Sequence, residues 1–273
     1  MNTRILFTDL DGTLLNDAKK VTAGNHAAID EALASGHKIV ISTGRPLVSA
    51  KMQAERIGLT RKGCYAITYN GSQIYDMYHQ KTVYGHAIPS SLVAPLFHKA
   101  AEMNLHIQTY SSTHILSEHE NDDLHMYAQI NKIPFRIVDN IDASLEGDPY
   151  KLIAISRDDH DKLLRFQDYV RHNYPDILDT FFSNDMYLEI VPIGISKGFA
   201  VKWLCEYLGI PLENSVAAGD AQNDIAMLEA AHVGAVMCNA FPGIAEHGNY
   251  ITKADNNHDG VAEIIHKFIL CDQ

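Results

Sequence analysis

The sequence predicts an α/β protein in which a doubly wound parallel sheet carries an inserted α+β module. Two observations support this prediction. Short apolar strands alternate with helices near both ends of the chain, and strands dominate its middle. A length of 273 residues is enough for one large domain or two ordinary ones. We therefore expect a core formed by both ends of the chain and a separate module between them.

The first part of the predicted core alternates three strands with two helices. The strands are apolar runs of the kind that is buried on both faces of a sheet: "RILFTD" (4–9), "HKIVIS" (37–42) and "YAITY" (65–69). One helix is expected over 21–36, with Thr22 as its N-cap and Gly36 as its stop. The other should start at Pro46 and end near Gly58. This order implies parallel strands with right-handed crossovers.

The same alternation returns near the C-terminus. It predicts a helix over 196–209, a strand over 215–220, a helix over 224–231 and a strand over 233–238. A short strand over 250–253 and a closing helix over 260–269 follow. Between the two halves lie mostly strands, expected over 72–76, 82–88, 106–112, 114–118, 135–139, 151–156, 179–184 and 187–192. We place the core at 1–83 and 188–273 and the inserted module at 84–187.

Composition excludes several classes of partner. The net charge of −12, with no run of Lys and Arg, disfavours binding to nucleic acid. No stretch reaches the roughly 18 apolar residues of a membrane span, and the N-terminus has no signal-peptide core. The four cysteines are scattered without a CxxC pair, which favours reduced thiols and a cytoplasmic location.

Polar residues of interest fall where the predicted strands end or helices begin, which is where open α/β sheets bind ligands. They are Asp9 and Asp11 after the first strand, Thr43, Gly44 and Arg45 after the second, Asp220 after a late strand, Asn223 and Asp224 at the next helix start, and Lys197 at the start of another helix.

Several carboxylates directed at one point need a cation among them, here from Asp9, Asp11, Asp220 and Asp224. Hard oxygen ligands suit Mg²⁺, which also binds substrate phosphate. Donors for phosphate oxygens are available from Thr43, Lys197 and the backbone near Gly12. A magnesium ion and a phosphate would thus share the site.

Each of these features alone has an ordinary explanation. An Asp-x-Asp after a strand is more often a loop or a helix cap, and Asp220 could simply cap the following helix. Thr43 could be a turn hydroxyl and Lys197 a solvated helix residue. The occurrence of all these motifs in order at strand ends and helix starts favours one common site. The 15 histidines show no metal-ligand spacing.

Four motifs, "DLDGTLL", "STGR", "GISKG" and "GDAQND", resemble those of the haloacid dehalogenase-like superfamily. The position of the insertion and "YNGSQIYD" (69–76) are similar to its Cof-type, or IIB, phosphatase branch. The resemblance implies a Rossmann-like catalytic core with an inserted cap domain. It also implies a Mg²⁺-dependent phosphatase that hydrolyses small phosphorylated metabolites, such as sugar phosphates, through an aspartyl-phosphate. The cap is similar only in size and texture, so no particular substrate is implied.

The resemblance also implies a role for each matched residue. Asp9 would be the nucleophile and Asp11 the acid/base. Mg²⁺ would be held by Asp9, Asp220 and the Asp11 carbonyl. Asp224 would be a further ligand or would contact one of the ligands. The phosphate or substrate would contact Gly12, Thr43, Gly44, Lys197 and Asn223, with Arg45 and Asn70 facing the substrate or the cap.

Three other functions are compatible with parts of this pattern. A sugar phosphomutase could use the same core and return the phosphoryl group to a sugar. A signalling receiver also surrounds a phosphorylated Asp with acidic residues, a Thr and a Lys, but it is much shorter and its acidic pair precedes the phosphoacceptor strand. A catalytically silent sugar-phosphate sensor is disfavoured by the intact Asp9 and Asp11. The sequence indicates no oligomeric state.

Overall fold

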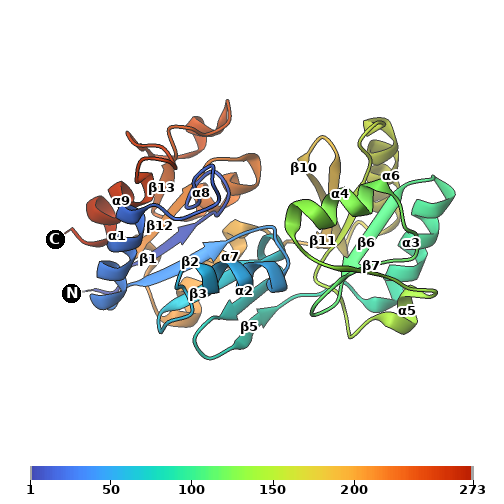
Figure 1. Ribbon diagram of the computed structural model, residues 1–273, viewed down its shortest axis with the longest axis horizontal. Coiled ribbons are helices and arrows are strands. Elements are labelled where there is room, and N and C mark those ends of the chain that lie inside the picture. The colour runs from blue at the N-terminus through green and yellow to red at the C-terminus, as the bar shows by residue number, and fades with distance from the viewer. Residues whose placement is uncertain (1, 272–273) are drawn as a thin grey trace. The chain divides into compact units, whose positions relative to one another are not determined.

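The structure, a computed structural model that describes residues 2–271, consists of two compact units (Figure 1). The first unit contains the residues up to Gly44, Ala50–Tyr84 and the chain from Ser196 onward. The second contains Arg45–Ser49 and Gly85–Ile195. Within the described part of the chain, no helix combines the length and apolar character needed to cross a bilayer.

An eight-stranded sheet forms the first unit, in the order β14-β13-β12-β1-β2-β3-β4-β5. The strands are β1 (Ile5–Thr8), β2 (Lys38–Ser42), β3 (Cys64–Thr68), β4 (Gln73–Asp76), β5 (Lys81–Gly85), β12 (Ser215–Gly219), β13 (Val233–Val236) and β14 (Tyr250–Ile251). The neighbouring strands β14, β13, β12, β1, β2 and β3 are all parallel, and β4 runs antiparallel to β3. Because β1 pairs with both β2 and β12, the two halves of the chain meet in the middle of the sheet.

Helices cover both faces of this sheet, as the buried strands require. They are α1 (Ala23–Ala34), α2 (Leu47–Arg56), α7 (Lys197–Leu208), α8 (Ile225–Ala230) and α9 (Gly260–Ile264). The apolar side chains of α7 and α8 pack against Phe7 and Val40, while α1 contacts β2 and α9. The predicted doubly wound α/β core is therefore confirmed.

The second unit has its own sheet of six strands, in the order β10-β11-β9-β6-β7-β8. The strands are β6 (His106–Tyr110), β7 (Ile115–Ser117), β8 (Phe135–Ile137), β9 (Leu152–Ile155), β10 (Leu178–Asn184) and β11 (Tyr187–Pro192). Its helices are α3 (Val93–Glu102), α4 (Asp122–Asn131), α5 (Ile141–Ser144) and α6 (His160–Asn173). Leu96 of α3 and Phe166 of α6 belong to one buried core with Ile107 and Leu188 of the sheet. This is the expected α+β texture.

The chain returns from the second unit to the first at a later residue than expected. We placed the return to the core at residue 188, inside β11. In the structure β11 is paired on both sides, with β9 and β10, so its backbone hydrogen bonds tie it to the second sheet. The second unit therefore extends to Ile195, and the core resumes at Ser196.

Two helices, α1 and α9, differ in detail from the sequence-based prediction. Thr22 occupies the N-cap of α1, but its side chain makes no capping hydrogen bond. Instead, the distant Asp259 accepts the backbone N–H of Asn25 at 3.1 Å. The expected closing helix over 260–269 is α-helical only to Ile264 and continues as a π-helix over Ile265–Ile269.

Candidate active site

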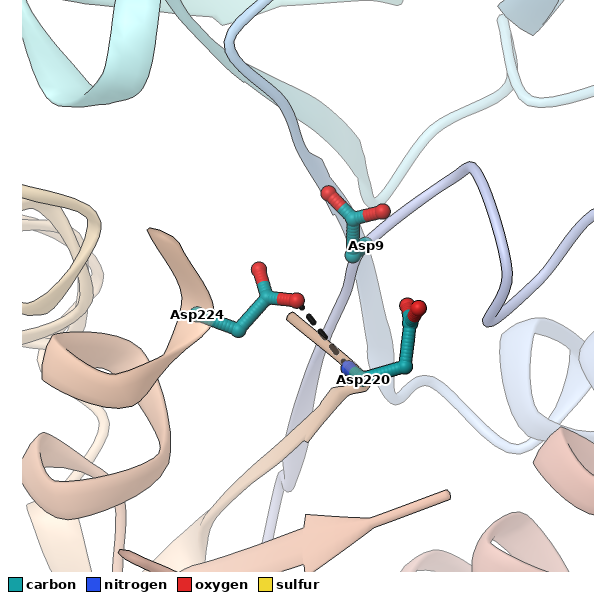
Figure 2. Close-up of side chains that lie close together, drawn as sticks. All are labelled: Asp9, Asp220 and Asp224. Carbon is teal, nitrogen blue, oxygen red and sulfur yellow. Dashed lines mark hydrogen bonds between the residues drawn. The ribbon is translucent and has the colours of Figure 1, made fainter. Parts of the chain in front are cut away.

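Three buried aspartates meet at the carboxyl ends of β1 and β12. Asp9 directly follows β1, Asp220 follows β12, and Asp224 ends the turn Gln222–Asp224. Because β1 and β12 are parallel neighbours, their ends lie side by side. One carboxylate oxygen from each residue lies within 4.8 Å of the others. Figure 2 shows the three carboxylates around one point.

Lys197 joins two of these aspartates. Its Nζ lies 2.6 Å from Oδ1 of Asp9 and 2.6 Å from Oδ1 of Asp224, and all three side chains are buried or nearly so. Lys197 is the first residue of α7, whose N-cap Ser196 accepts the N–H of Phe199 at 3.0 Å. The capped helix start therefore holds the ammonium in the carboxylate cluster.

A glycine lets α7 approach α8 closely. A Cβ at Gly198 would stand 2.2 Å from the carbonyl oxygen of Ala226, which is far inside contact distance. Only glycine fits there without a shift of one backbone. The position of Lys197, one residue before, thus depends on this close packing.

Asp224 connects Lys197 to the loop after β12. Its Oδ2 accepts the backbone N–H groups of Asp220 at 3.0 Å and Ala221 at 3.1 Å, the first of which is drawn in Figure 2. Gly219 leaves room for this carboxylate, because a Cβ there would lie 2.5 Å from Cβ of Asp224. Asp224 therefore orients both the lysine and the loop that carries Asp220.

The loop after β1 fixes Asp220 from the other side. Thr13 is fully buried, and its hydroxyl donates to Oδ1 of Asp220 at 2.6 Å. Gly12 has φ +84°, and a Cβ there would come within 2.4 Å of Asp220 Oδ2. The carbonyl of Gly12 accepts the side-chain amide of Asn239 at 2.8 Å.

Thr13 and Asn239 are contacts of the site that our sequence reasoning missed. Thr13 stands directly behind the Asp-x-Asp pair, and Asn239 follows β13, again at a carboxyl strand end. The positions of Thr13 and Asn239 at strand ends could therefore have marked them as candidate site residues. Their hydrogen-bond partners could not be predicted, because these depend on the positive φ of Gly12 and on loops far apart in sequence.

The charges at this site are unbalanced. Burial, together with the charges of Asp224 and Asp220, raises the pKa of Asp9 to about 8, against the opposing effect of Lys197. Burial and the charge of Asp224 raise the pKa of Asp220 to about 6, while the Thr13 hydrogen bond opposes this rise. For Lys197, burial disfavours the charge, but Asp224 and Asp9 outweigh it and raise the pKa. In the protein alone, the ionised forms of Asp9 and Asp220 are thus disfavoured, and a cation bound among these carboxylates would stabilise them.

The donor set fits a hard divalent cation. It consists of buried carboxylate oxygens, with no sulfur or imidazole in the group. Such ligands suit Mg²⁺. Asp11 is not among the described carboxylates that come together, contrary to our expectation for its side chain. It directly precedes Gly12 and is half-exposed, with Oδ1 paired to Nζ of Lys19 at 2.8 Å.

The expected phosphate donors lie at the end of β2. Thr43 is buried, and its N–H donates to the carbonyl of Ile67 at 2.9 Å. The N–H of Asn70 donates to the Thr43 carbonyl at 3.2 Å, and a Cβ on Gly44 would lie 2.8 Å from Asn70 Oδ1. The structure therefore brings Thr43, Gly44 and Asn70 together.

Asn70 stands out by its unsatisfied amide. The residue is 4% exposed and adopts a left-handed conformation, with φ 58°. Neither Oδ1 nor Nδ2 has a hydrogen-bond partner within the described chain. Buried polar atoms are nearly always paired, so this amide is available for a ligand.

Asn223 and Arg45 are two further expected site residues. Asn223 is half-buried in the turn that ends at Asp224. Arg45 belongs to the second unit, where its guanidinium donates to the Ser49 hydroxyl at 3.2 Å. Their roles toward a substrate remain predictions.

A doubly wound core with an inserted α+β unit, and with buried aspartates and a lysine at the carboxyl strand ends, is the arrangement found in one class of hydrolases. Residues 6–265 match the family described as haloacid dehalogenase-like hydrolase, so the chain belongs to this family. Its motifs place it in the Cof-type, or IIB, branch, and it is an enzyme of the phosphatase class.

Individual relatives match along their whole length. Pyridoxal phosphate phosphatase YbhA of Escherichia coli is 31% identical over 99% of this chain and 100% of the relative. The 5-amino-6-(5-phospho-D-ribitylamino)uracil phosphatase YcsE of Bacillus subtilis is 30% identical over 98% and 96%. A haloacid dehalogenase-like hydrolase from Bacteroides thetaiotaomicron, solved by crystallography, superimposes with a TM-score of 0.89 at 27% identity, over 97% of this chain and 99% of that one.

Proposed function

We propose that this protein is a Mg²⁺-dependent phosphatase that hydrolyses small phosphate monoesters through a phosphoryl group on Asp9. The observation that supports this most directly is the pair of 2.6 Å contacts from Lys197 to Asp9 and Asp224. They hold one ammonium beside the carboxylate that would attack, where it can counter charge on the phosphoryl oxygens.

The first chemical step would form an Asp9 Oδ–P bond while the bond from phosphorus to the ester oxygen breaks. Asp11 would give its proton to the departing oxygen. In the second step water attacks the phosphorus, its proton goes to Asp11, and the Asp9–phosphate bond breaks. Asp9 is thereby restored and inorganic phosphate leaves.

Around the phosphoryl group, hydrogen-bond donors would come from Thr43, Lys197, Asn223 and the backbone near Gly12. The unpaired amide of Asn70, held against Gly44, supports a substrate contact there as well. Asp9, Asp220 and the Asp11 carbonyl would hold Mg²⁺, with Asp224 oriented toward Lys197 beside them. When bound, the ion supplies positive charge for the carboxylates and the phosphate.

The substrate class we infer is a phosphorylated small metabolite, such as a sugar phosphate, a nucleotide or a phosphorylated cofactor. The full-length similarity to phosphatases of pyridoxal phosphate and of a ribitylamino-uracil phosphate supports this class. We infer that the second unit selects the leaving group, and that the enzyme acts in the cytoplasm without nucleic acid.

The test is a phosphate-release assay over a panel of these metabolites, with Mg²⁺ present and after exhaustive chelation. We expect release only with the metal. Undiminished activity after chelation would contradict the metal assignment. A sugar bisphosphate belongs in the panel, because isomerisation without free phosphate would identify a phosphomutase instead.

A further inference from the structure

The turn Tyr69–Gly71, which follows β3, has an unusual backbone. Tyr69, Asn70 and Gly71 are consecutive residues with positive φ, at 51°, 58° and 114°. Asparagine is often found in the left-handed region, but a bulky tyrosine is strained there. All three residues are buried. The turn therefore carries a conformational cost inside the first unit, and strain of this kind clusters at ligand sites.

The turn packs against the start of α7. A Cβ at Gly71 would lie 2.4 Å from the carbonyl oxygen of Ser196 and 3.4 Å from the backbone nitrogen of Lys197. The next residue back along the chain, Asn70, donates its N–H to the carbonyl of Thr43 at 3.2 Å. The turn is thus tied both to the end of β2 and to the helix start that carries Lys197.

The side-chain amide of Asn70 offers two kinds of hydrogen bond. Nδ2 can donate and Oδ1 can accept, but both atoms are buried without a partner in the part of the chain that the structure describes. Exchange of oxygen and nitrogen in the amide would not change this, because neither atom is paired. The backbone conformation does not explain the amide either, since glycine would suit the same φ without a buried polar group. The two unpaired atoms indicate a ligand that both accepts and donates.

A phosphate group alone would satisfy only one of these atoms. Near neutral pH a phosphate monoester carries close to two negative charges, and its oxygens accept hydrogen bonds. It can accept from Nδ2, but it has almost no proton to donate to Oδ1. A hydroxyl group of the substrate can donate to Oδ1.

We propose that Asn70 is a specificity-determining residue that selects esters with a hydroxyl group on the carbon next to the ester carbon. The phosphate accepts from Nδ2, and this hydroxyl donates to Oδ1. The inference rests on the proposed function and narrows its substrate class to phosphorylated hydroxy compounds. An analogue without the hydroxyl is rejected, because it leaves the amide oxygen buried and unpaired.

The experiment measures kcat/KM for two esters that differ by one hydroxyl, propane-1,2-diol 1-phosphate and propyl phosphate. The wild type should prefer the first by about 5- to 150-fold, the range for one unpaired buried group. Asn70→Gly deletes the amide, suits φ 58° and should remove this preference. Asn70→Asp keeps an acceptor for the hydroxyl but repels the phosphate, so both esters should react more slowly while the preference remains.

Asn104→Gly is the matched control, because Asn104 is an exposed asparagine with φ 51°, and it should keep the wild-type preference. Circular dichroism shows whether the variants are folded. The inference would be overturned by equal wild-type kcat/KM for the two esters, or by hydrolysis of neither while other esters of the panel react. An unchanged preference in Asn70→Gly, or its loss in Asn70→Asp, would overturn it as well. In each of these cases the proposed function stands, whereas phosphate release from no ester at all would overturn both.

Discussion

Nζ of Lys197 lies 2.6 Å from Oδ1 of Asp9, although 188 positions separate the two residues in the chain. The contact exists because β1 and the start of α7 are brought to the same end of the sheet. It joins a fully buried ammonium to a carboxylate whose charge burial disfavours. Neither group is stable as an isolated buried ion, so each depends on the other.

Lys197→Ala should lower kcat/KM by a factor of about 10² to 10³, equivalent to about 2.7–4 kcal/mol, by analogy with the loss of one oxyanion donor. Initial rates with a good substrate measure this loss. Because the change also leaves buried carboxylates unpaired, circular dichroism must first show a folded protein. Lys202→Ala, an exposed lysine of the same helix, is the control. A loss of less than threefold would remove Lys197 from the site.

Asp9→Asn should abolish turnover while substrate still binds, because the amide keeps the shape of the carboxylate but cannot attack phosphorus. Labelled substrate should leave an acid-labile phosphoryl group on the wild type and none on the variant. Asp30→Asn, on the exposed side of α1, should retain full labelling. An acid-stable label, or none on the wild type, would argue against an acyl phosphate at Asp9.

Replacing residues 86–194 by a short linker should leave the first unit folded, since its eight-stranded sheet uses none of them. Hydrolysis of a small aryl phosphate should survive better than hydrolysis of the preferred metabolite, whose leaving group would lose its contacts. The ratio of kcat/KM for the two substrates measures this. Equal loss of both activities would indicate that the second unit has a structural role or supplies catalytic groups.

A pH effect on stability is expected from His106 of β6. Its Nδ1 faces the Asn121 amide nitrogen at 3.0 Å, which can only donate, and its Nε2 faces Oε1 of Gln108 at 2.9 Å. In the folded protein the imidazole ring is therefore neutral, with its proton on Nε2. Burial lowers its pKa, although the hydrogen bond to Gln108 opposes this.

The sign of the effect follows from this lowered pKa. In the unfolded chain the His106 ring binds a proton more readily than in the folded protein. The contribution of the neutral ring to the free energy of unfolding is therefore complete above the unfolded pKa of about 6.5 and is lost as the pH falls below it. The unfolding temperature should drop between pH 7.5 and 5.5. His106→Gln should flatten this dependence, whereas His98→Gln, at an exposed position, should not. An unchanged slope in His106→Gln would refute the assignment.

The sequence was sufficient to predict that Asp9, Asp220 and Asp224 gather at the sheet edge, and the reason is geometric. Parallel strands end at one edge, so Asp9 and Asp220 had to lie close together once both strands were recognised. The capped start of α7 likewise placed Lys197. These inferences need only the direction of the strands and helices.

What the sequence did not show depends on individual turns. The carboxylate of Asp11 was expected in the cluster, but the turn at Gly12 leaves it half-exposed beside Lys19. The partners of Thr13 and Asn239 are set by the same turn. The border at Ile195 was missed because alternation along β11 cannot tell which sheet supplies its neighbours.

The central place of β1 also has a consequence for the order in which the chain folds during synthesis. Ile5 of β1 pairs with Ser215 of β12, and these positions are 210 residues apart (215 minus 5). At about 5–20 residues per second, one edge of the apolar strand β1 waits roughly 10 to 40 seconds for its partner. Meanwhile Gly85–Ile195, one continuous segment with its own sheet, emerges complete and can fold first. We therefore expect one edge of β1 to stay unpaired in the nascent protein until β12 has been synthesised, which is a period of exposure to aggregation.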